Sequence, residues 1–110
     1  MINMTKLEKL MRELGHPEII LGTGYLRKGI ELYEDGQRRM TGEIYPNIAR
    51  AANTTASRVE RAMRHSIQRA WERGNAEVQT KIFGYTVDPD KGTPTVGEYI
   101  AQMARECHED

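Results

Sequence analysis

A long amphipathic helix is predicted by the stretch Asn53-Thr-Thr-Ala-Ser-Arg-Val-Glu-Arg-Ala-Met-Arg-His-Ser-Ile-Gln-Arg-Ala-Trp-Glu-Arg-Gly74. At about 100° per residue, its apolar side chains fall on one arc and most of its cations fall on the opposite arc. The apolar arc contains Val59, Met63, Ile67 and Ala70. The polar arc contains Arg58, Arg61, His65, Gln68 and Arg69. We expect the helix to pack on a core through the first arc and to offer positive charge on the second.

The residues at both ends set the limits of this helix. Thr54 or Thr55 can accept a hydrogen bond from a free amide of the first turn, and Gly74 favours termination. The helix is therefore expected over about 56–73.

A shorter helix is expected just upstream, within an element that covers about 41–52. Its segment Ile44-Tyr-Pro-Asn-Ile-Ala-Arg50 contains a proline, which is tolerated in the first turn of a helix, so we expect a break or restart at Tyr45-Pro46. Two helices joined by a tight polar turn favour a helix-turn-helix over about 41–73, a motif that reads DNA.

The N-terminal third of the chain predicts two helices. The first begins at Thr5-Lys-Leu-Glu8, which has the form of a capping box, and ends at Gly15 before Pro17. The second covers about 22–35. Its expected buried stripe consists of Tyr25, Leu26, Ile30 and Tyr33.

The C-terminal third predicts two more helices, separated by an irregular link from Tyr85 to Pro94. Asn75 can cap the first of them and Gly84 ends it, whereas Thr95-Val-Gly-Glu98 forms a capping box for the last. The expected buried stripe of the last helix consists of Tyr99, Ile100, Met103, Ala104 and Cys107. Together these elements predict an all-α fold, a compact six-helix domain that contains a helix-turn-helix.

Length and charge narrow the functional classes. The 110 residues suit a single domain over 1–110. The formal net charge is zero, so overall charge does not favour an acidic partner. Residues 50–73, however, contain six arginines and two glutamates. This surplus of four positive charges attracts phosphates locally, because screening limits electrostatic fields to roughly 10 Å.

The sequence lacks features that secreted proteins, membrane-spanning proteins, metalloproteins and enzymes usually have. A single cysteine, Cys107, excludes an internal disulfide and favours a reducing, cytoplasmic location. The start of the chain has no signal-peptide pattern, and no apolar run approaches the length needed to span a membrane. The histidines lack metal-ligand spacing, and no nucleophile has a recognisable base partner. We therefore expect a binding protein and not an enzyme, with no metal and no cofactor.

The glycines in Leu21-Gly-Thr-Gly-Tyr-Leu-Arg-Lys-Gly29 superficially suggest a dinucleotide-binding loop. Arg27 occupies the position where that motif requires its third glycine, and no strand-helix-strand unit can follow. We expect this segment to be part of the second helix.

The cations of the central helix have two interpretations. Arginines opposite an apolar stripe often form a solvated face. They are also concentrated in the first turns of the helix, just after a tight polar turn, where a recognition helix presents its side chains to base edges. Arg58, Arg61 and His65 lie centrally on that face, and arginine can donate two hydrogen bonds to guanine O6 and N7. Expected phosphate contacts are Arg50, Thr54, Thr55, Arg69 and Arg73.

Two other side chains of this helix leave alternatives open. Glu60 precedes Arg64 by four residues, which suits an intrahelical ion pair, but its carboxylate could instead accept from cytosine N4. Trp71 lies near the apolar arc and is expected in the core, with stacking on single-stranded bases as the less favoured alternative.

Several sequence segments of the chain also resemble those of a known family. The matching segments are Ala56-Ser-Arg-Val-Glu-Arg-Ala62, Arg64-His65, Ala70-Trp71, Arg73-Gly-Asn75, Phe83-Gly-Tyr-Thr-Val87, Leu14-Gly-His-Pro17, Gly24-Tyr-Leu-Arg27, Tyr45-Pro-Asn-Ile-Ala49 and Pro94-Thr95 to Ile100-Ala101. In this order they resemble the C-terminal effector domain of the sporulation stage-zero response regulators, and they cover nearly the whole chain.

The resemblance implies a six-helix transcription regulator that recognises a TGTCGAA-type box in double-stranded DNA. It further implies tandem self-association on DNA and a contact with the sigma subunit of RNA polymerase. Carried over by position, the groove-facing residues are Ser57, Arg58, Glu60, Arg61, Arg64 and His65. Glu60 and Arg64 rest on the resemblance alone.

Two departures from the family pattern affect the interpretation. The family's regulators carry an N-terminal receiver domain, for which this chain has no room, so we expect either a fragment or a free-standing effector domain. The segment from Ile30 to Met40 is shorter and more polar than the family's link between helices two and three. An alternative function is a receiver-less interaction module that binds a full-length relative or RNA polymerase rather than DNA.

Overall fold

The computed structural model describes residues 1–84 and 92–109. Within these residues the chain forms six α-helices and one π-helical turn, without a strand. The elements are α1 (Met4–Leu14), α2 (Leu21–Glu34), η1 (Met40–Ile44), α3 (Tyr45–Ala52), α4 (Ala56–Arg73), α5 (Ala76–Phe83) and α6 (Val96–Cys107). The all-α, six-helix fold predicted from the sequence is confirmed.

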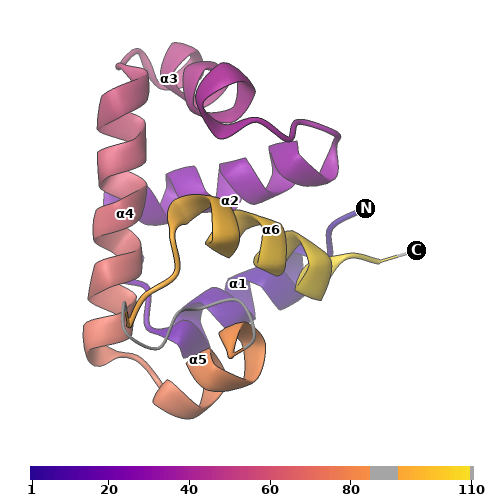
Figure 1. The fold of residues 1–110 in the computed structure, drawn as a ribbon, viewed down its shortest axis with the longest axis vertical. Helices are drawn as coiled ribbons and strands as arrows, with labels where there is room; N and C mark the ends of the chain where they lie inside the picture. The colour runs from indigo at the N-terminus through magenta and orange to yellow at the C-terminus, as the bar shows by residue number, and fades with distance from the viewer. Residues whose placement is uncertain (85–91, 110) are drawn as a thin grey trace.

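Helix α4 runs along one side of the molecule, and the other helices lie on the same side of it (Figure 1). α2 packs against α4 and α6, α3 packs against α4, and α1 contacts α5 and α6. The apolar stripes meet between these helices in one cluster of buried side chains. Its largest fully buried members are Tyr99, Phe83, Leu7, Met11, Leu14, Leu26, Ile30, Ile44, Met63, Ile67, Ile100 and Met103.

Most helix ends lie where the capping residues predict them. Gly15 follows α1 in the left-handed region with φ of 103°, which suits a residue without Cβ. The Asn75 side chain accepts from the amides of Glu77 and Val78, and Thr95 and Glu98 form the expected capping box. The break at Tyr45-Pro46 is confirmed, because η1 ends at Ile44 and α3 begins at Tyr45. Of the predicted link Tyr85 to Pro94, residues 85–91 lie outside the described residues.

The predicted capping box at the start of α1 is wrong. Asn3, not Thr5, caps this helix, and its side chain accepts from the Lys6 amide at 3.0 Å. The Asn3 amide also donates to the carbonyl of Cys107 at 2.9 Å, which ties the residue to the end of α6. Asparagine and threonine are both effective caps, so this tertiary hydrogen bond accounts for the choice of Asn3.

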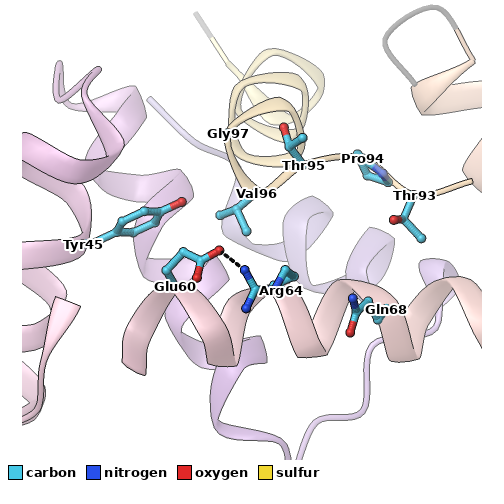
Figure 2. A pocket seen from close by; sticks show the side chains of 9 residues that line it. All are labelled: Tyr45, Glu60, Arg64, Gln68, Thr93, Pro94, Thr95, Val96 and Gly97. Carbon is cyan, nitrogen blue, oxygen red and sulfur yellow. Dashed lines mark hydrogen bonds and ion pairs between the residues drawn. The ribbon is translucent and has the colours of Figure 1, made fainter. Parts of the chain in front are cut away.

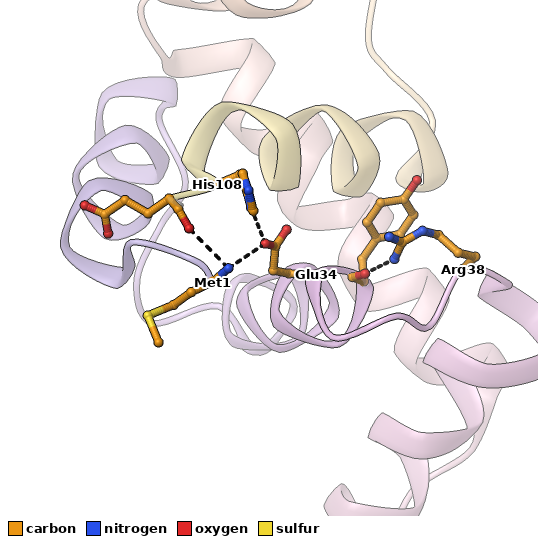
Figure 3. A network of polar contacts seen from close by, with 6 residues as sticks. Met1, Glu34, Arg38 and His108 are labelled. Carbon is orange, nitrogen blue, oxygen red and sulfur yellow. Dashed lines mark hydrogen bonds and ion pairs between the residues drawn. The ribbon is translucent and has the colours of Figure 1, made fainter.

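The two ends of the described chain meet beside the last turn of α2 (Figure 3). The Met1 ammonium donates to Glu34 Oε1 at 2.9 Å and to the Glu109 carbonyl at 3.3 Å, and His108 Nδ1 also contacts Glu34 Oε1. These contacts lower the pKa of Glu34, the ammonium first and His108 second. The arrangement joins α2 to both ends of the chain.

Of the glycines in α2, Gly22 lies closest to the backbone of α4. A Cβ at this position would lie 1.9 Å from the carbonyl oxygen of Ala62. Gly24, two residues later, is exposed, and a Cβ there would have no atom within 4 Å. The segment Leu21–Gly29, whose glycines superficially suggest a dinucleotide-binding loop, is thus helical as expected. Within it, Gly22 permits the backbones of α2 and α4 to pack directly against each other.

A chain of buried hydrogen bonds links the α1–α2 connection to α2, α4 and α6. Thr23 Oγ1 donates to the Pro17 carbonyl at 2.7 Å, so Ser66 must donate to Thr23, and His16 Nδ1 must donate to Ser66 at 2.8 Å. In a neutral ring, His16 Nε2 then accepts from the Tyr99 hydroxyl at 2.7 Å. Burial favours this neutral form, because it lowers the pKa of His16 from 6.5 to about 4.

We expect Gly22→Ala to lower the free energy of unfolding by about 1–3 kcal/mol, because the added methyl group must push α2 away from α4. Gly24→Ala is the matched control, and it should raise stability by up to about 1 kcal/mol through helix propensity. Urea unfolding followed by circular dichroism measures both. Equal effects of the two substitutions would contradict the close crossing.

Stability should fall as pH decreases from 6.5 to about 4. Unfolded His16 takes up a proton near pH 6.5, whereas folded His16 takes it up only near pH 4. The unfolded state is therefore favoured across this window, by a total of about 3 kcal/mol. NMR titration of the His16 ring should show a midpoint near pH 4, and a midpoint near 6.5 would contradict the effect of burial on this histidine. His65→Gln, which removes an exposed histidine, should preserve the stability loss.

Candidate nucleic-acid interface

A three-residue turn, 53–55, joins α3 to α4. Asn53 ends α3 in the left-handed region with φ of 56°, a conformation that asparagine tolerates better than most residues. The Thr54 amide donates to the Ala49 carbonyl at 2.9 Å. The Thr55 side chain accepts from the Arg58 amide at 3.2 Å, so Thr55 is the N-cap of α4. The turn therefore gives α4 a defined first residue and direction.

The two faces predicted for α4 are present in the structure. Val59, Met63, Ile67 and Ala70 are at most 1% exposed and lie in the protein interior. The opposite side is exposed over eight residues, namely Ser57, Arg58, Arg61, Arg64, His65, Gln68, Arg69 and Glu72. Burial of the apolar face holds the helix axis, while the cationic face remains accessible along the helix.

Arg58, Arg61 and His65 form the centre of the exposed face. They are spaced at three and four residues, so their side chains leave the helix on one side. Within residues 1–84 and 92–109, the guanidinium groups of Arg58 and Arg61 make no hydrogen bond or ion pair. Both groups retain their full set of donors for an external acceptor.

Glu60 and Arg64 lie at the border of this face and not at its centre. Arg64 donates to Glu60 at 2.7 Å, and their side chains are 53% and 30% exposed respectively. Figure 2 shows the pair beside a groove between α4 and the segment Thr93–Gly97, with Tyr45 at one end. The pKa of Tyr45 is raised to about 12, by burial first and by the Glu60 charge second. Of the two alternatives that the sequence left open for Glu60, the intrahelical pair with Arg64 is the one formed in this structure.

The five expected phosphate contacts fall into two groups. Arg50 lies in α3, where it donates to Asn47 at 2.8 Å, and Thr54 and Thr55 lie in the turn that leads into α4. Arg69 and Arg73 lie in the last turns of α4, where Arg69 pairs with Glu72 at 3.4 Å. An 18-residue helix is roughly 27 Å long, so the two groups are separated by about that length.

Trp71 packs against the core as expected and is partly buried. Its ring makes edge-on contacts with Phe83 and Tyr99, at centroid distances of 5.3 and 6.3 Å. These aromatic contacts favour a packing role for the indole over stacking on bases.

The sequence analysis missed the residues of other elements that line the groove beside α4. Tyr45 comes from the start of α3, and Thr93–Gly97 comes from the start of α6, some thirty residues after Arg64. The capping box at Thr95 predicted the start of α6 but did not indicate that this segment lies beside α4. Only packing brings these segments together.

Two other kinds of site are not found in the part of the chain that the structure describes. No three His, Cys, Asp or Glu side chains of residues 1–84 and 92–109 gather closely enough to hold a metal ion. Among the same residues, no helix has the length and apolar character that crossing a membrane requires. The accessible cationic face of α4 is therefore the candidate site with the clearest chemistry.

Comparison with known protein families places this geometry in context. Residues 7–107 match the family described as "Sporulation initiation factor Spo0A C terminal", so the match spans all six helices apart from the first turn of α1. The family consists of helical DNA-binding domains of a transcription factor and is not an enzyme family. The chain belongs to this family of sporulation initiation factor C-terminal domains and is a DNA-binding effector domain of that regulator type.

Proposed function

We propose that the chain is a cytoplasmic, sequence-specific regulator of transcription that inserts α4 into the major groove of a TGTCGAA-type box. The observation that carries the proposal is the exposed row of Arg58, Arg61 and His65 on a helix whose opposite face is buried. A helix held in this way fixes the backbone positions from which its cations project before it meets DNA. Little conformational entropy of the backbone is then lost on binding.

The exposed face has the chemistry that base recognition requires. Each arginine can donate two hydrogen bonds to O6 and N7 of guanine, and Ser57 and His65 supply further polar groups to the groove. Glu60 and Arg64 are proposed as additional DNA contacts at the border of this face. Phosphates of the duplex are proposed to meet Arg50, Thr54, Thr55, Arg69 and Arg73.

Further partners follow from family membership and not from a particular surface of this chain. We propose that copies bind in tandem on DNA and that the domain contacts the sigma subunit of RNA polymerase. Both proposals suit a transcription regulator whose domain occupies only a short stretch of a promoter.

Replacing Arg61 by Ala should weaken binding to the box by about 1–3 kcal/mol and relax selectivity at one base pair, because a bidentate base contact is lost. Arg105→Ala is the matched control, since Arg105 is exposed on α6 and pairs with Gln102. Fluorescence anisotropy with the box and its single-base variants measures both effects. Parent-like binding by Arg61→Ala would remove Arg61 from the interface.

A competing function is a protein-interaction module, which the zero net charge of the chain favours. Salt dependence separates the two functions. Groove binding that neutralises three phosphates should weaken roughly 40-fold between 50 and 200 mM salt. A titration of the box at both concentrations, with light scattering on the protein alone, tests this expectation. Weak binding to DNA together with a salt-insensitive protein complex would favour the interaction module.

A further inference from the structure

We propose that Arg64 and the groove beside it bind the sugar-phosphate backbone of the duplex whose bases α4 reads, which rests on the function proposed above. The flank groove lies between Glu60, Arg64 and Gln68 of α4 and the segment Thr93–Gly97, and it has a volume of about 390 Å³. Arg64 would then contact a phosphate and not a base edge.

The dimensions of DNA determine where the flank groove would lie relative to the phosphates. The major groove is about 12 Å wide, and an α-helix with its side chains is about 10–12 Å across. A helix inserted there has a row of phosphates along each flank. On one flank of α4 lies the segment Thr93–Gly97, which Figure 2 shows alongside Arg64 and Gln68. This segment would therefore face the backbone of one strand.

The Glu60 carboxylate orients Arg64 toward this flank. It accepts from one terminal nitrogen of Arg64 at 2.7 Å, and a guanidinium carries five N–H donors in a planar fork. The remaining donors can serve a phosphate while the pair persists. Held by this pair at the border of α4, Arg64 is displaced from the row formed by Arg58, Arg61 and His65. Glu60 is accordingly a positioning residue.

The opposite wall of the groove supplies hydroxyl groups. Thr95 Oγ1 accepts from the Glu98 amide at 3.1 Å, so its own hydroxyl proton can be donated to a phosphate oxygen. Thr93 precedes it and is only partly buried. Hydroxyl donors commonly contact DNA backbones without reading sequence, as this assignment requires.

The first test is Arg64→Gln, measured on the box and on a scrambled duplex at several salt concentrations. Loss of one phosphate contact should reduce the slope of log K against log salt by about 0.9, and affinity should fall about eightfold at 0.1 M salt on both duplexes. A loss confined to the box, with altered preference at one base pair, would show that Arg64 reads a base. An unchanged affinity would also overturn the proposal.

The second test adds a charge to the groove. Thr93→Lys should tighten binding to both duplexes about eightfold at 0.1 M salt, since one more phosphate is neutralised. Thr80→Lys on the exposed side of α5 is the matched control for net charge. Equal effects of the two lysines would show that the groove does not meet the backbone. If the parent protein does not prefer the box over the scrambled duplex, the proposed function itself fails.

Discussion

The packing of α2 against α4 at Gly22 is the constraint on which the other contacts of the domain depend. With no side chain at Gly22, the α2 backbone reaches the Ala62 carbonyl, and the apolar arc of α4 is covered along its length. The next residue of α2, Thr23, begins the series of buried hydrogen bonds that runs through Ser66 and His16 to Tyr99. An apolar contact and a directional polar network therefore hold the same helix crossing.

This crossing also determines what α4 can do. Because its buried face is held by α2, α3 and α6, the exposed face is a rigid surface whose spacing is set by helix geometry. Binding of DNA by such a surface relies on a preorganised helix backbone rather than on folding of the segment. The domain thus differs from disordered basic tails, which attract phosphates but do not hold a fixed register on base pairs.

The sequence analysis succeeded where local physical chemistry decides the outcome. The limits of α4, the cap at Thr95 and the restart at Tyr45 each depend on residues within one helical turn, and all three are found in the structure. The cap of α1 was misassigned because Asn3 is tied to Cys107, a residue 104 positions away. No local pattern contains such a bond. The centre of the candidate site, Arg58, Arg61 and His65, could likewise be read from periodicity alone.

The sequence by itself determined the all-helical fold and the two faces of α4, because each follows from capping chemistry and from spacings of three or four residues. It placed Glu60 one turn before Arg64 but left open whether the two side chains pair. Tertiary structure alone decided which helix covers the apolar face of α4, how His16 is buried in a neutral state, and that the start of α6 lies beside Arg64. The physical reason is the same in each case. These features arise from contacts between residues that are distant in the chain, and such contacts are selected by the packing of the whole core and not by any single segment.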